Sequence, residues 1–224
     1  MCKSPEGGDV TTALGQRDSR SEEIRPTGDG PQGTQGTDPF RDRLLDGMAA
    51  SIIERGFRDT TVADIVRHAR TSKRTFYAQF ASKEDCLIEL LRWNNETLIT
   101  NIRNAVDPDA DWQEQIRQAV DAYVGHIAAR PEITLAWIRE LPALGAVAQP
   151  LHRVAMEHLT DMLVDLSDSP GFRRAQIAPI TRPLALIVLG GLRELTALFV
   201  EAGHDIQGIV EPAIVASTAI LGPR

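Results

Sequence analysis

The chain has few cysteines and few aromatic residues, and both shortages narrow the kind of protein it can be. Its 224 residues include two cysteines, Cys2 and Cys86, too few for a disulfide framework. Aromatic residues make up 5% of the chain although 42% of it is hydrophobic, so the apolar content is mainly aliphatic. Aliphatic stripes alongside abundant Ala, Leu and Arg favour packed helices over a β-sandwich. The sequence predicts an all-α protein in a reducing, cytoplasmic environment.

Long apolar runs and catalytic motifs are also missing. The longest apolar run, Leu184 to Leu192, stops at Arg193-Glu194, and residues 1–38 contain no signal-peptide core. We therefore expect a chain that is neither exported nor membrane-spanning. The sequence contains no nucleophile elbow, Walker loop, dinucleotide glycine pattern or HExxH helix, so it predicts neither an enzyme nor a bound cofactor.

The net charge of −7 is distributed unevenly. Residues 1–39 carry four Lys or Arg against seven Asp or Glu, residues 40–92 carry ten against eight, and residues 93–224 carry ten against sixteen. The positive excess therefore lies in one short stretch. Because that excess is two charges, DNA affinity would have to come from basic residues placed on one face and from dimerisation.

Composition and periodicity divide the chain. Residues 1–38 are rich in Gly, Pro, Thr, Gln, Asp and Ser and show no hydrophobic period, which predicts a disordered tail. Helical spacing then begins, with Gly56 as the expected end of the first helix. Three further helices are expected to start at polar caps: Thr61 with Asp64 as its capping-box partner, Ser72 before a helix from Lys73 to about Phe80, and Ser82 before a helix reaching toward Val106.

Beyond a break at residues 107–111, apolar periodicity predicts five more helices, at 112–129, 133–141, 151–166, 177–200 and 206–221. No stretch alternates with a period of two. The prediction is about nine helices and no sheet.

Three short helices joined by tight turns, the third polar and basic, are what a reader of the DNA major groove requires. If Phe76 and Phe80 point into the core, a rotation of ~100° per residue turns Arg74 and Tyr77 outward, with Thr75 and Gln79 beyond them. Arg74 offers a fork that matches guanine edges or phosphate. The alternative is that this face is a solvated amphipathic surface.

The stretch 61–85 resembles the DNA-binding signature of the TetR family of bacterial transcriptional regulators, in particular through Thr75-Phe76-Tyr77 followed by Phe80-Ala81-Ser82-Lys83-Glu84. The resemblance covers about residues 40–90. It implies a three-helix helix-turn-helix domain at 39–85 and a helical effector-binding and dimerisation domain at 86–224. The positions that match the family's DNA contacts are Thr61, Ser72, Lys73, Arg74, Thr75, Tyr77, Gln79 and Lys83.

The sequence departs from the family at Arg70, where the turn usually has a left-handed glycine. A left-handed conformation costs a non-glycine residue about 1 kcal/mol. Two alternatives follow: a strained turn, or a phosphate contact made by Arg70.

The resemblance also implies a homodimer formed by the last two long helices, near 177–201 and 206–221, which would present two recognition helices to a near-palindromic operator. Helices 112–129, 133–141 and 151–166 would then enclose a pocket for an effector, and the aliphatic composition of this half points to a lipophilic one. Its expected lining is Tyr123, His126, Trp137, Arg139 and Glu140. Each has an alternative role, as a core residue, a satisfied histidine or a solvated ion pair.

Two further alternatives concern side chains with metal or redox chemistry. His152 and His158 are six residues apart, fall on different helix faces and have no Cys or carboxylate cluster near them, so we predict no metal site. Cys86 could be a redox switch, but a small buried hydrophobe is the favoured role.

Together these features predict a repressor that occupies a palindromic operator as a dimer and is released by a small-molecule effector. The alternative is a helical dimeric regulator that acts through a protein partner without binding an effector.

Overall fold

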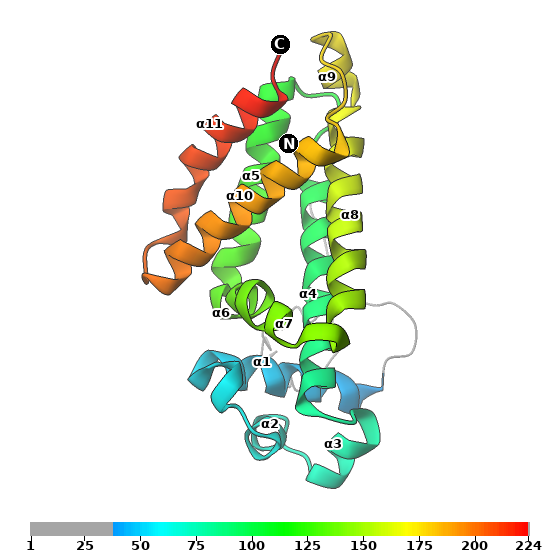
Figure 1. Cartoon of the computed structure of the whole chain (residues 1–224), viewed down its shortest axis with the longest axis vertical. Coiled ribbons are helices and arrows are strands. Elements are labelled where there is room, and N and C mark those ends of the chain that lie inside the picture. The colour runs from blue at the N-terminus through cyan, green and yellow to red at the C-terminus, as the bar shows by residue number, and fades with distance from the viewer. Residues whose placement is uncertain (1–37, 224) are drawn as a thin grey trace, which may run out of the picture. The chain divides into compact units, whose positions relative to one another are not determined.

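A computed structural model describes residues 38–223, which form one helical unit (Figure 1). The described residues contain helices and turns but no strand, which confirms the all-α prediction. The predicted tail lies outside the described residues except for Asp38. The α-helices are α1 (Pro39–Asp59), α2 (Val62–His68), α3 (Lys73–Gln79), α4 (Lys83–Ala105), α5 (Trp112–Ala129), α6 (Pro131–Leu135), α7 (Leu141–Ala143), α8 (Gln149–Ser167), α9 (Pro170–Arg174), α10 (Arg182–Glu201) and α11 (Val210–Leu221).

The first four helices begin at side chains that accept a hydrogen bond from the exposed amide of the first turn. Asp38, Thr61, Ser72 and Ser82 each do this, and Thr61 with Asp64 forms the predicted capping box. Gly56 has φ 78° and interrupts the helical geometry of α1, as the sequence predicted, but helical turns continue to Asp59. These local signals fix the helix-turn-helix.

The core of α1 to α4 continues into the second half of the chain. Leu44, Met48, Phe76 and Leu87 are fully buried in the same cluster as Ile133 of α6 and Leu141 of α7. No break in packing occurs at residue 85, so the division of the chain at this position stays a prediction about function.

The second half is a bundle of α5, α8, α10 and α11 around the upper part of α4 (Figure 1). The predicted helix 133–141 is built from α6, a π-helical turn η1 (Ala136–Glu140) and α7. A short 3₁₀ turn η2 (Gly145–Val147) precedes α8, and another, η3 (Ile206–Ile209), precedes α11.

In this half the predicted start of one helix is wrong and one short helix was missed. The helix expected from residue 177 begins at Arg182, because Pro183 in the first turn lacks an amide for a preceding turn. The short helix α9 was not predicted; Gly171 at its start lies against the carbonyl oxygen of Ala110, where a Cβ would be 2.1 Å from that oxygen.

Helix α10 is long and apolar enough to cross a membrane, judged by length and composition alone. Of its most apolar 18-residue window, 22% is buried inside the protein. In this fold α10 packs on α8 and α11. Its remaining apolar surface is therefore exposed on the outside of the bundle.

Candidate DNA-contacting face and internal cavity

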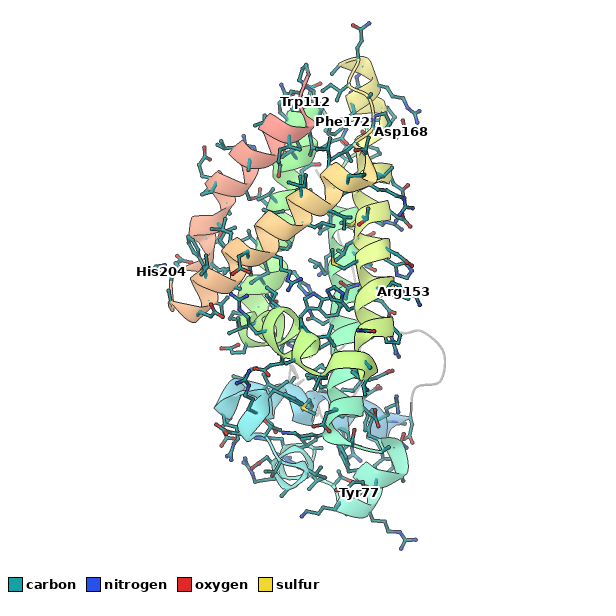
Figure 2. All side chains as sticks on the ribbon, viewed as in Figure 1. Tyr77, Trp112, Arg153, Asp168, Phe172 and His204 are labelled. Atoms are coloured by element: carbon teal, nitrogen blue, oxygen red, sulfur yellow. The ribbon has the colours of Figure 1, made fainter. Side chains whose placement is uncertain are left out.

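The third helix has the two-sided character that its sequence predicts. Phe76 and Phe80 are 0% and 4% exposed and anchor α3 to the core, whereas Tyr77 is 58% exposed. Lys73 and Arg74 are exposed beside it. Figure 2 shows Tyr77 at the opposite end of the described unit from Trp112 and Phe172. Lys73, Arg74 and Tyr77 thus form a free polar face at one end of the described unit.

The hydroxyl-bearing candidates lie at helix starts. Thr61 Oγ1 donates to Asp64 Oδ2 at 2.6 Å, and Ser72 Oγ accepts from the Thr75 amide at 3.1 Å. Thr75 Oγ1 is 3.0 Å from the Ser72 hydroxyl. Thr61 and Ser72 are exposed and Thr75 is partly buried. These residues hold the first turns of α2 and α3 and present hydroxyls at their solvent-facing ends.

The structure does not bring Gln79 and Lys83 onto this free face. Gln79 Nε2 donates to Asp38 Oδ2, and Lys83 Nζ donates to the carbonyl oxygens of Phe57, Arg58 and Thr60 at 3.2, 3.3 and 2.9 Å. The ammonium also lies 4.6 Å from the centre of the Phe57 ring. The Lys83 ammonium thus caps the C-terminal end of α1.

Arg70 adopts the left-handed conformation that the family's glycine would take, with φ 49°. Its side chain is exposed. The turn between α2 and α3 therefore has the left-handed backbone expected of a glycine at this position, although the residue there is an arginine.

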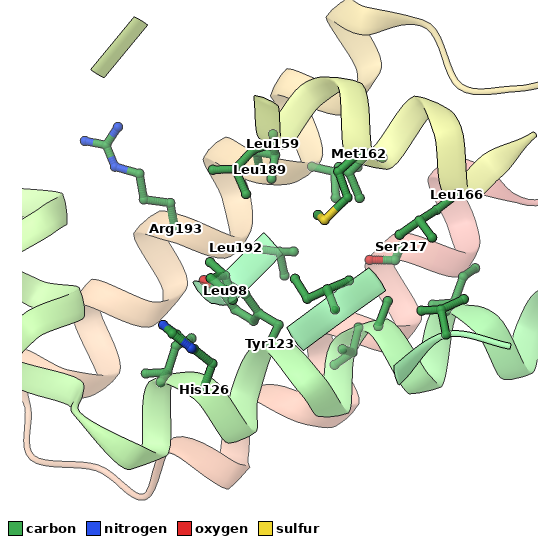
Figure 3. Close-up of a pocket in the computed structure, with 18 of the residues that line it drawn as sticks. Leu98, Tyr123, His126, Leu159, Met162, Leu166, Leu189, Leu192, Arg193 and Ser217 are labelled. Atoms are coloured by element: carbon green, nitrogen blue, oxygen red, sulfur yellow. The ribbon is translucent and has the colours of Figure 1, made fainter. Parts of the chain in front are cut away.

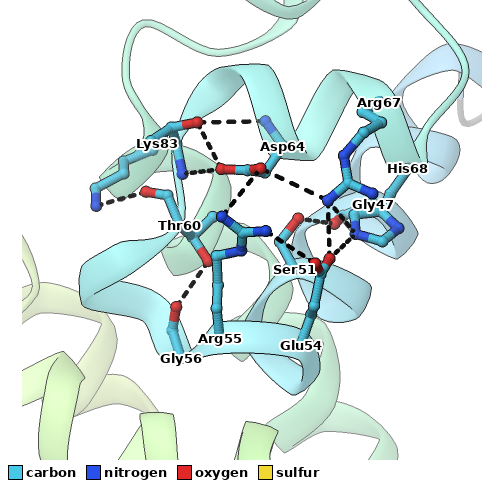
Figure 4. Close-up of polar contacts among 11 residues, drawn as sticks. Gly47, Ser51, Glu54, Arg55, Gly56, Thr60, Asp64, Arg67, His68 and Lys83 are labelled. Carbon is cyan, nitrogen blue, oxygen red and sulfur yellow. Dashed lines mark hydrogen bonds and ion pairs between the residues drawn. The ribbon is translucent and has the colours of Figure 1, made fainter.

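A polar network between α1 and α2 was not predicted (Figure 4). Glu54 accepts hydrogen bonds from Arg67 at 2.8 Å and Arg55 at 2.8 Å, and lies 2.7 Å from His68 Nε2. These partners, Arg67 first, lower the pKa of Glu54 to about 2. No sequence signal could have found the network, because its members come from different helices.

A cavity of about 130 Å³ lies inside the bundle (Figure 3). Its walls are mostly apolar and come mainly from α4, α5, α8, α10 and α11, with single residues from α6 and α9 and two from η1. Among the predicted effector residues, Tyr123, His126 and Trp137 line it. The Tyr123 hydroxyl forms a 2.7 Å hydrogen bond with the Thr196 hydroxyl, which ties α5 to α10. Burial raises the pKa of Tyr123 to about 12.

Arg139 and Glu140 lie outside the cavity lining. Arg139 forms ion pairs with Glu201 at 2.6 Å and Glu194 at 2.9 Å, while Glu140 pairs with Arg58 at 3.2 Å. Both residues therefore lie on the surface, where their ion pairs link η1 to α10 and to α1.

Seven further polar residues line the cavity and were not predicted: Asn94, Asn95, Gln115, Thr134, Ser167, Arg193 and Ser217. Asn94 and Asn95 are 8% and 5% exposed, which is unusual for asparagine in a helix. Two adjacent asparagines within an apolar helical stretch are a signal that could have pointed to them. In the sequence, Arg193 stands out only as the end of an apolar run.

Cys86 is fully buried, and burial raises the pKa of its thiol to about 12. A thiol in this state is a poor nucleophile. The buried-hydrophobe role is therefore the one that the packing supports.

The N-terminal helices are the part of the chain most similar to known proteins. Residues 44–90 match the family model described as bacterial regulatory proteins, tetR family. The chain is 40% identical over 77 residues to the HTH-type transcriptional repressor KstR2 of Mycobacterium tuberculosis, which covers 34% of this chain and 38% of that protein. It is 27% identical over 149 residues to the HTH-type transcriptional activator FasR of Mycolicibacterium smegmatis, covering 66% and 68%.

The matched part of the chain therefore spans less than half of the length of KstR2. Among solved structures, the fold resembles that of a transcriptional regulator FadR from Bacillus subtilis in complex with stearoyl-CoA, with a TM-score of 0.68, 16% identity and coverage of 82% of this chain and 99% of the other. At that identity the likeness concerns the fold.

Proposed function

Because residues 44–90 match the tetR family model and the similar proteins are transcriptional regulators, we propose that the chain is a cytoplasmic repressor that binds a palindromic operator as a dimer and is released by a lipophilic effector. The observation that carries the DNA-binding half is the free face of α3. The observation that carries the effector half is the apolar cavity.

Lys73, Arg74 and Tyr77 carry the proposed DNA contact. All three are exposed, and no ion pair engages Lys73 or Arg74 within residues 38–223. A guanidinium in this position matches the two acceptors of guanine or a phosphate, while Lys73 and the Tyr77 hydroxyl suit phosphates. Further phosphate contacts are proposed for the hydroxyls at the helix starts, those of Thr61, Ser72 and Thr75. The proposed role of Gln79 and Lys83 is to hold α3 and the end of α1 in place through their hydrogen bonds.

The outer face of α10 and α11 is the proposed dimer interface. Leu186, Ile187 and Leu198 of α10 are 47%, 61% and 54% exposed, and Val215 of α11 is 58% exposed. Exposed apolar side chains on this helix pair favour a second copy of the chain across a twofold axis. Exposed Gly190 and Gly191 would let the two α10 backbones approach closely. The two recognition helices would then meet successive major grooves, about 34 Å apart.

Effector release is proposed to act through η1. Trp137 and Ile138 of this turn line the cavity, whereas Ala136 belongs to the buried core shared with α1 and α4. A cavity of about 130 Å³ is smaller than the ~300–1,000 Å³ of typical ligand sites, so a lipid-sized effector must push the helices apart. That displacement would move η1 against α1 and change the spacing of the two α3 helices. The stearoyl-CoA held by the FadR neighbour is an example of a lipophilic effector in this fold.

A fluorescence-anisotropy assay with DNA from upstream of the chain's own gene tests this function. We expect DNA binding that Tyr77→Ala and Arg74→Ala each weaken by roughly five- to 150-fold, since a good base contact contributes ~1–3 kcal/mol. Arg153→Ala on the exposed side of α8 is the matched control and should bind as the native protein does. Unchanged affinity of the two α3 variants would contradict the assigned contact face.

The same complex tests the effector. Addition of a long-chain fatty acid or its CoA thioester should release the DNA. A dimer that binds DNA tightly but responds to no lipophilic molecule, while co-purifying with one defined protein, would instead favour a regulator acting through a protein partner.

A further inference from the structure

The histidine in the cavity wall, His126, differs from the other polar residues around it. Its ring nitrogen Nε2 is buried and has no hydrogen-bond partner, alone among the buried side-chain nitrogens and oxygens of residues 38–223. His126 lines the cavity three residues after Tyr123, on the same side of α5 (Figure 3). A buried polar atom without a partner costs free energy, and a ligand that bonds to this nitrogen would remove that cost.

Other polar side chains of the lining are already paired within the protein. The hydroxyls of Tyr123 and Thr196 bond to each other at 2.7 Å. Near the start of α5, Gln115 Nε2 donates to two carbonyl oxygens of the turn 107–111, at 3.0 and 2.9 Å. Ser167 Oγ donates to a carbonyl oxygen of α8 at 2.9 Å. A ligand would have to break a bond of the fold to use any of these donors, whereas the nitrogen of the histidine is free.

The hydrogen bond on the other side of the ring decides what Nε2 offers a ligand. The Asn101 side-chain Nδ2 lies 3.4 Å from His126 Nδ1, and since an amide nitrogen donates, Nδ1 accepts. Burial, and after it the nearby Arg130, lowers the pKa of His126, so the ring is neutral at about pH 7. A neutral ring has a single N–H, which is therefore on Nε2. The cavity thus contains a neutral donor that requires an acceptor.

The cavity lining formed by residues 38–223 has no unengaged charge to offer a ligand. It contains no aspartate, glutamate or lysine. Its one arginine, Arg193, extends away from His126 in Figure 3, and its guanidinium donates to the carbonyl oxygen of Ile138 at 3.3 Å. Arg139 and, more weakly, Arg193 lower the pKa of the exposed Glu194, so the charge of Arg193 acts on a surface carboxylate. An ionised ligand group beside His126 would be buried without a counter-charge.

From the unpartnered N–H in this mostly apolar cavity, we infer that the effector is an uncharged molecule with a hydrogen-bond acceptor, such as the carbonyl oxygen of a ketone or an ester, which accepts from His126 Nε2. The rest of the molecule would contact the apolar walls. This rests on the proposed function of the cavity as the effector site. A fatty acid would have to take up a proton to bind in the same way, so its ester should bind more tightly than the acid.

Two ligands of the same shape test the inference: 2-heptanone and 2-methyl-1-heptene, in which a methylene group replaces the carbonyl oxygen. Their affinities are measured by isothermal titration calorimetry on the full chain. In His126→Phe the ratio of ketone affinity to alkene affinity should fall about tenfold relative to the native protein, because only the ketone loses a hydrogen bond. His126→Gln keeps a donor and should retain part of the ratio.

His158→Phe changes an exposed histidine of α8 and is the matched control, which should leave the ratio as it is in the native protein. An unchanged ratio in His126→Phe would overturn the inference and leave the cavity as an effector site.

Charged ligands of the same length test the second part of the inference. At about pH 8, where heptanoate is an anion and 2-aminoheptane a cation, both should bind the native protein at least about tenfold more weakly than 2-heptanone. Tighter binding of either ion would overturn the inference, again without touching the proposed function. If none of the four ligands binds while DNA binding is intact, both the inference and the effector half of the proposed function fail.

Nuclear magnetic resonance of the native protein with ¹⁵N-labelled histidine tests the position of the proton without any substitution. We expect His126 to carry its proton on Nε2, and 2-heptanone to shift the Nε2–H resonance far more than 2-methyl-1-heptene does. A proton on Nδ1 in the free protein, or equal shifts with the two ligands, would overturn the inference. This measurement decides the case even if His126→Phe does not fold.

Discussion

Among the residues of the helix-turn-helix, the polar atoms divide into those that the protein uses itself and those that it leaves free. Lys83 donates to three carbonyl oxygens at the end of α1, and Gln79 donates to Asp38, whereas Lys73 and Arg74 make no such bond within the described residues. The resemblance to the family assigns all four of these residues to DNA contacts. Their hydrogen-bond partners separate a stabilising role from the proposed DNA-contacting role.

Lys83→Met should therefore lower stability and leave the electrostatics of DNA binding unchanged. The carbonyl oxygens of Arg58 and Thr60 would lose the Lys83 donor, while that of Phe57 keeps the Thr60 amide, which predicts a decrease of about 1–3 kcal/mol in the free energy of unfolding, measured by urea titration. Lys73→Met should leave stability within about 0.5 kcal/mol and reduce the slope of log K against log salt by about 0.9 for each phosphate that Lys73 neutralises. A reduced salt slope for Lys83→Met at full stability would contradict this division.

Arg70→Gly should stabilise the protein, since Arg70 holds φ 49°, a conformation that glycine adopts without steric cost. The expected gain is up to about 1 kcal/mol in the free energy of unfolding, reduced by the greater freedom of glycine in the unfolded chain. Arg153→Gly, in an exposed part of α8, should destabilise by about 1 kcal/mol and serves as the control for the substitution itself. A destabilised Arg70→Gly variant would show that the Arg70 side chain makes a stabilising contact.

At the level of elements, the helix starts that are marked by a capping side chain were predicted correctly. The predicted starts of α2, α3 and α4 agree with the structure because Thr61, Ser72 and Ser82 each bind an amide of the first turn. The helices α5, α8, α10 and α11 have no side-chain cap bond. Apolar periodicity alone predicted both ends of α5 correctly, but α10 begins later than predicted and α11 begins only after the 3₁₀ turn η3, because their starts are set by packing that a single sequence does not display. The missed α9 and the late start of α10 both lie in this uncapped half.

The candidate sites divide in the same way. The outward face of α3 could be predicted because two buried phenylalanines fix the rotation of a short helix. The cavity lining could not, because it is assembled from seven helices and η1, and Asn94 or Arg193 becomes a cavity residue only when the others surround it. For the same reason Arg139, two residues from Trp137, lies outside the cavity in ion pairs with α10.

The network that fixes α2 on α1 should make stability depend on pH. The pKa of Glu54 is about 2 in the folded protein against 4.5 for a free side chain, so the unfolded chain binds more protons between these values. The stabilisation is present above pH 4.5 and is lost as pH falls toward 2. Glu54→Gln should be less stable than the native protein in urea titrations at about pH 6, and the difference should shrink at about pH 4 and again at about pH 3.

Salt should weaken this effect, because Glu54 is on the surface. Glu157→Gln, an exposed position on α8 that forms no ion pair within residues 38–223, is the control and should show a constant difference at each pH. A constant difference for Glu54→Gln as well would mean that its ion pairs do not persist in solution.

For the whole molecule, charge and symmetry have to be considered together. Residues 40–92 have a net excess of two positive charges in a chain of net charge −7, so one copy has little electrostatic attraction for DNA. A twofold dimer doubles the number of phosphate contacts and fixes the distance between the α3 helices. Operator affinity should therefore depend on α10 and α11, which lie far from the DNA-contacting face, as much as on α3 (Figure 1).

Ile187→Glu separates these contributions. Ile187 is 61% exposed on the outer face of α10, and a carboxylate there would be buried without a partner against a second copy. We expect a folded monomer in analytical ultracentrifugation, with operator affinity reduced by at least a hundredfold and a salt slope about half that of the native protein, because half of the phosphate contacts remain. Val147→Glu changes a side chain that is 63% exposed at η2, outside this face, and should remain a dimer with full affinity. A dimeric Ile187→Glu variant with native affinity would place the interface elsewhere, and the two α3 helices would then need a different axis to reach successive grooves.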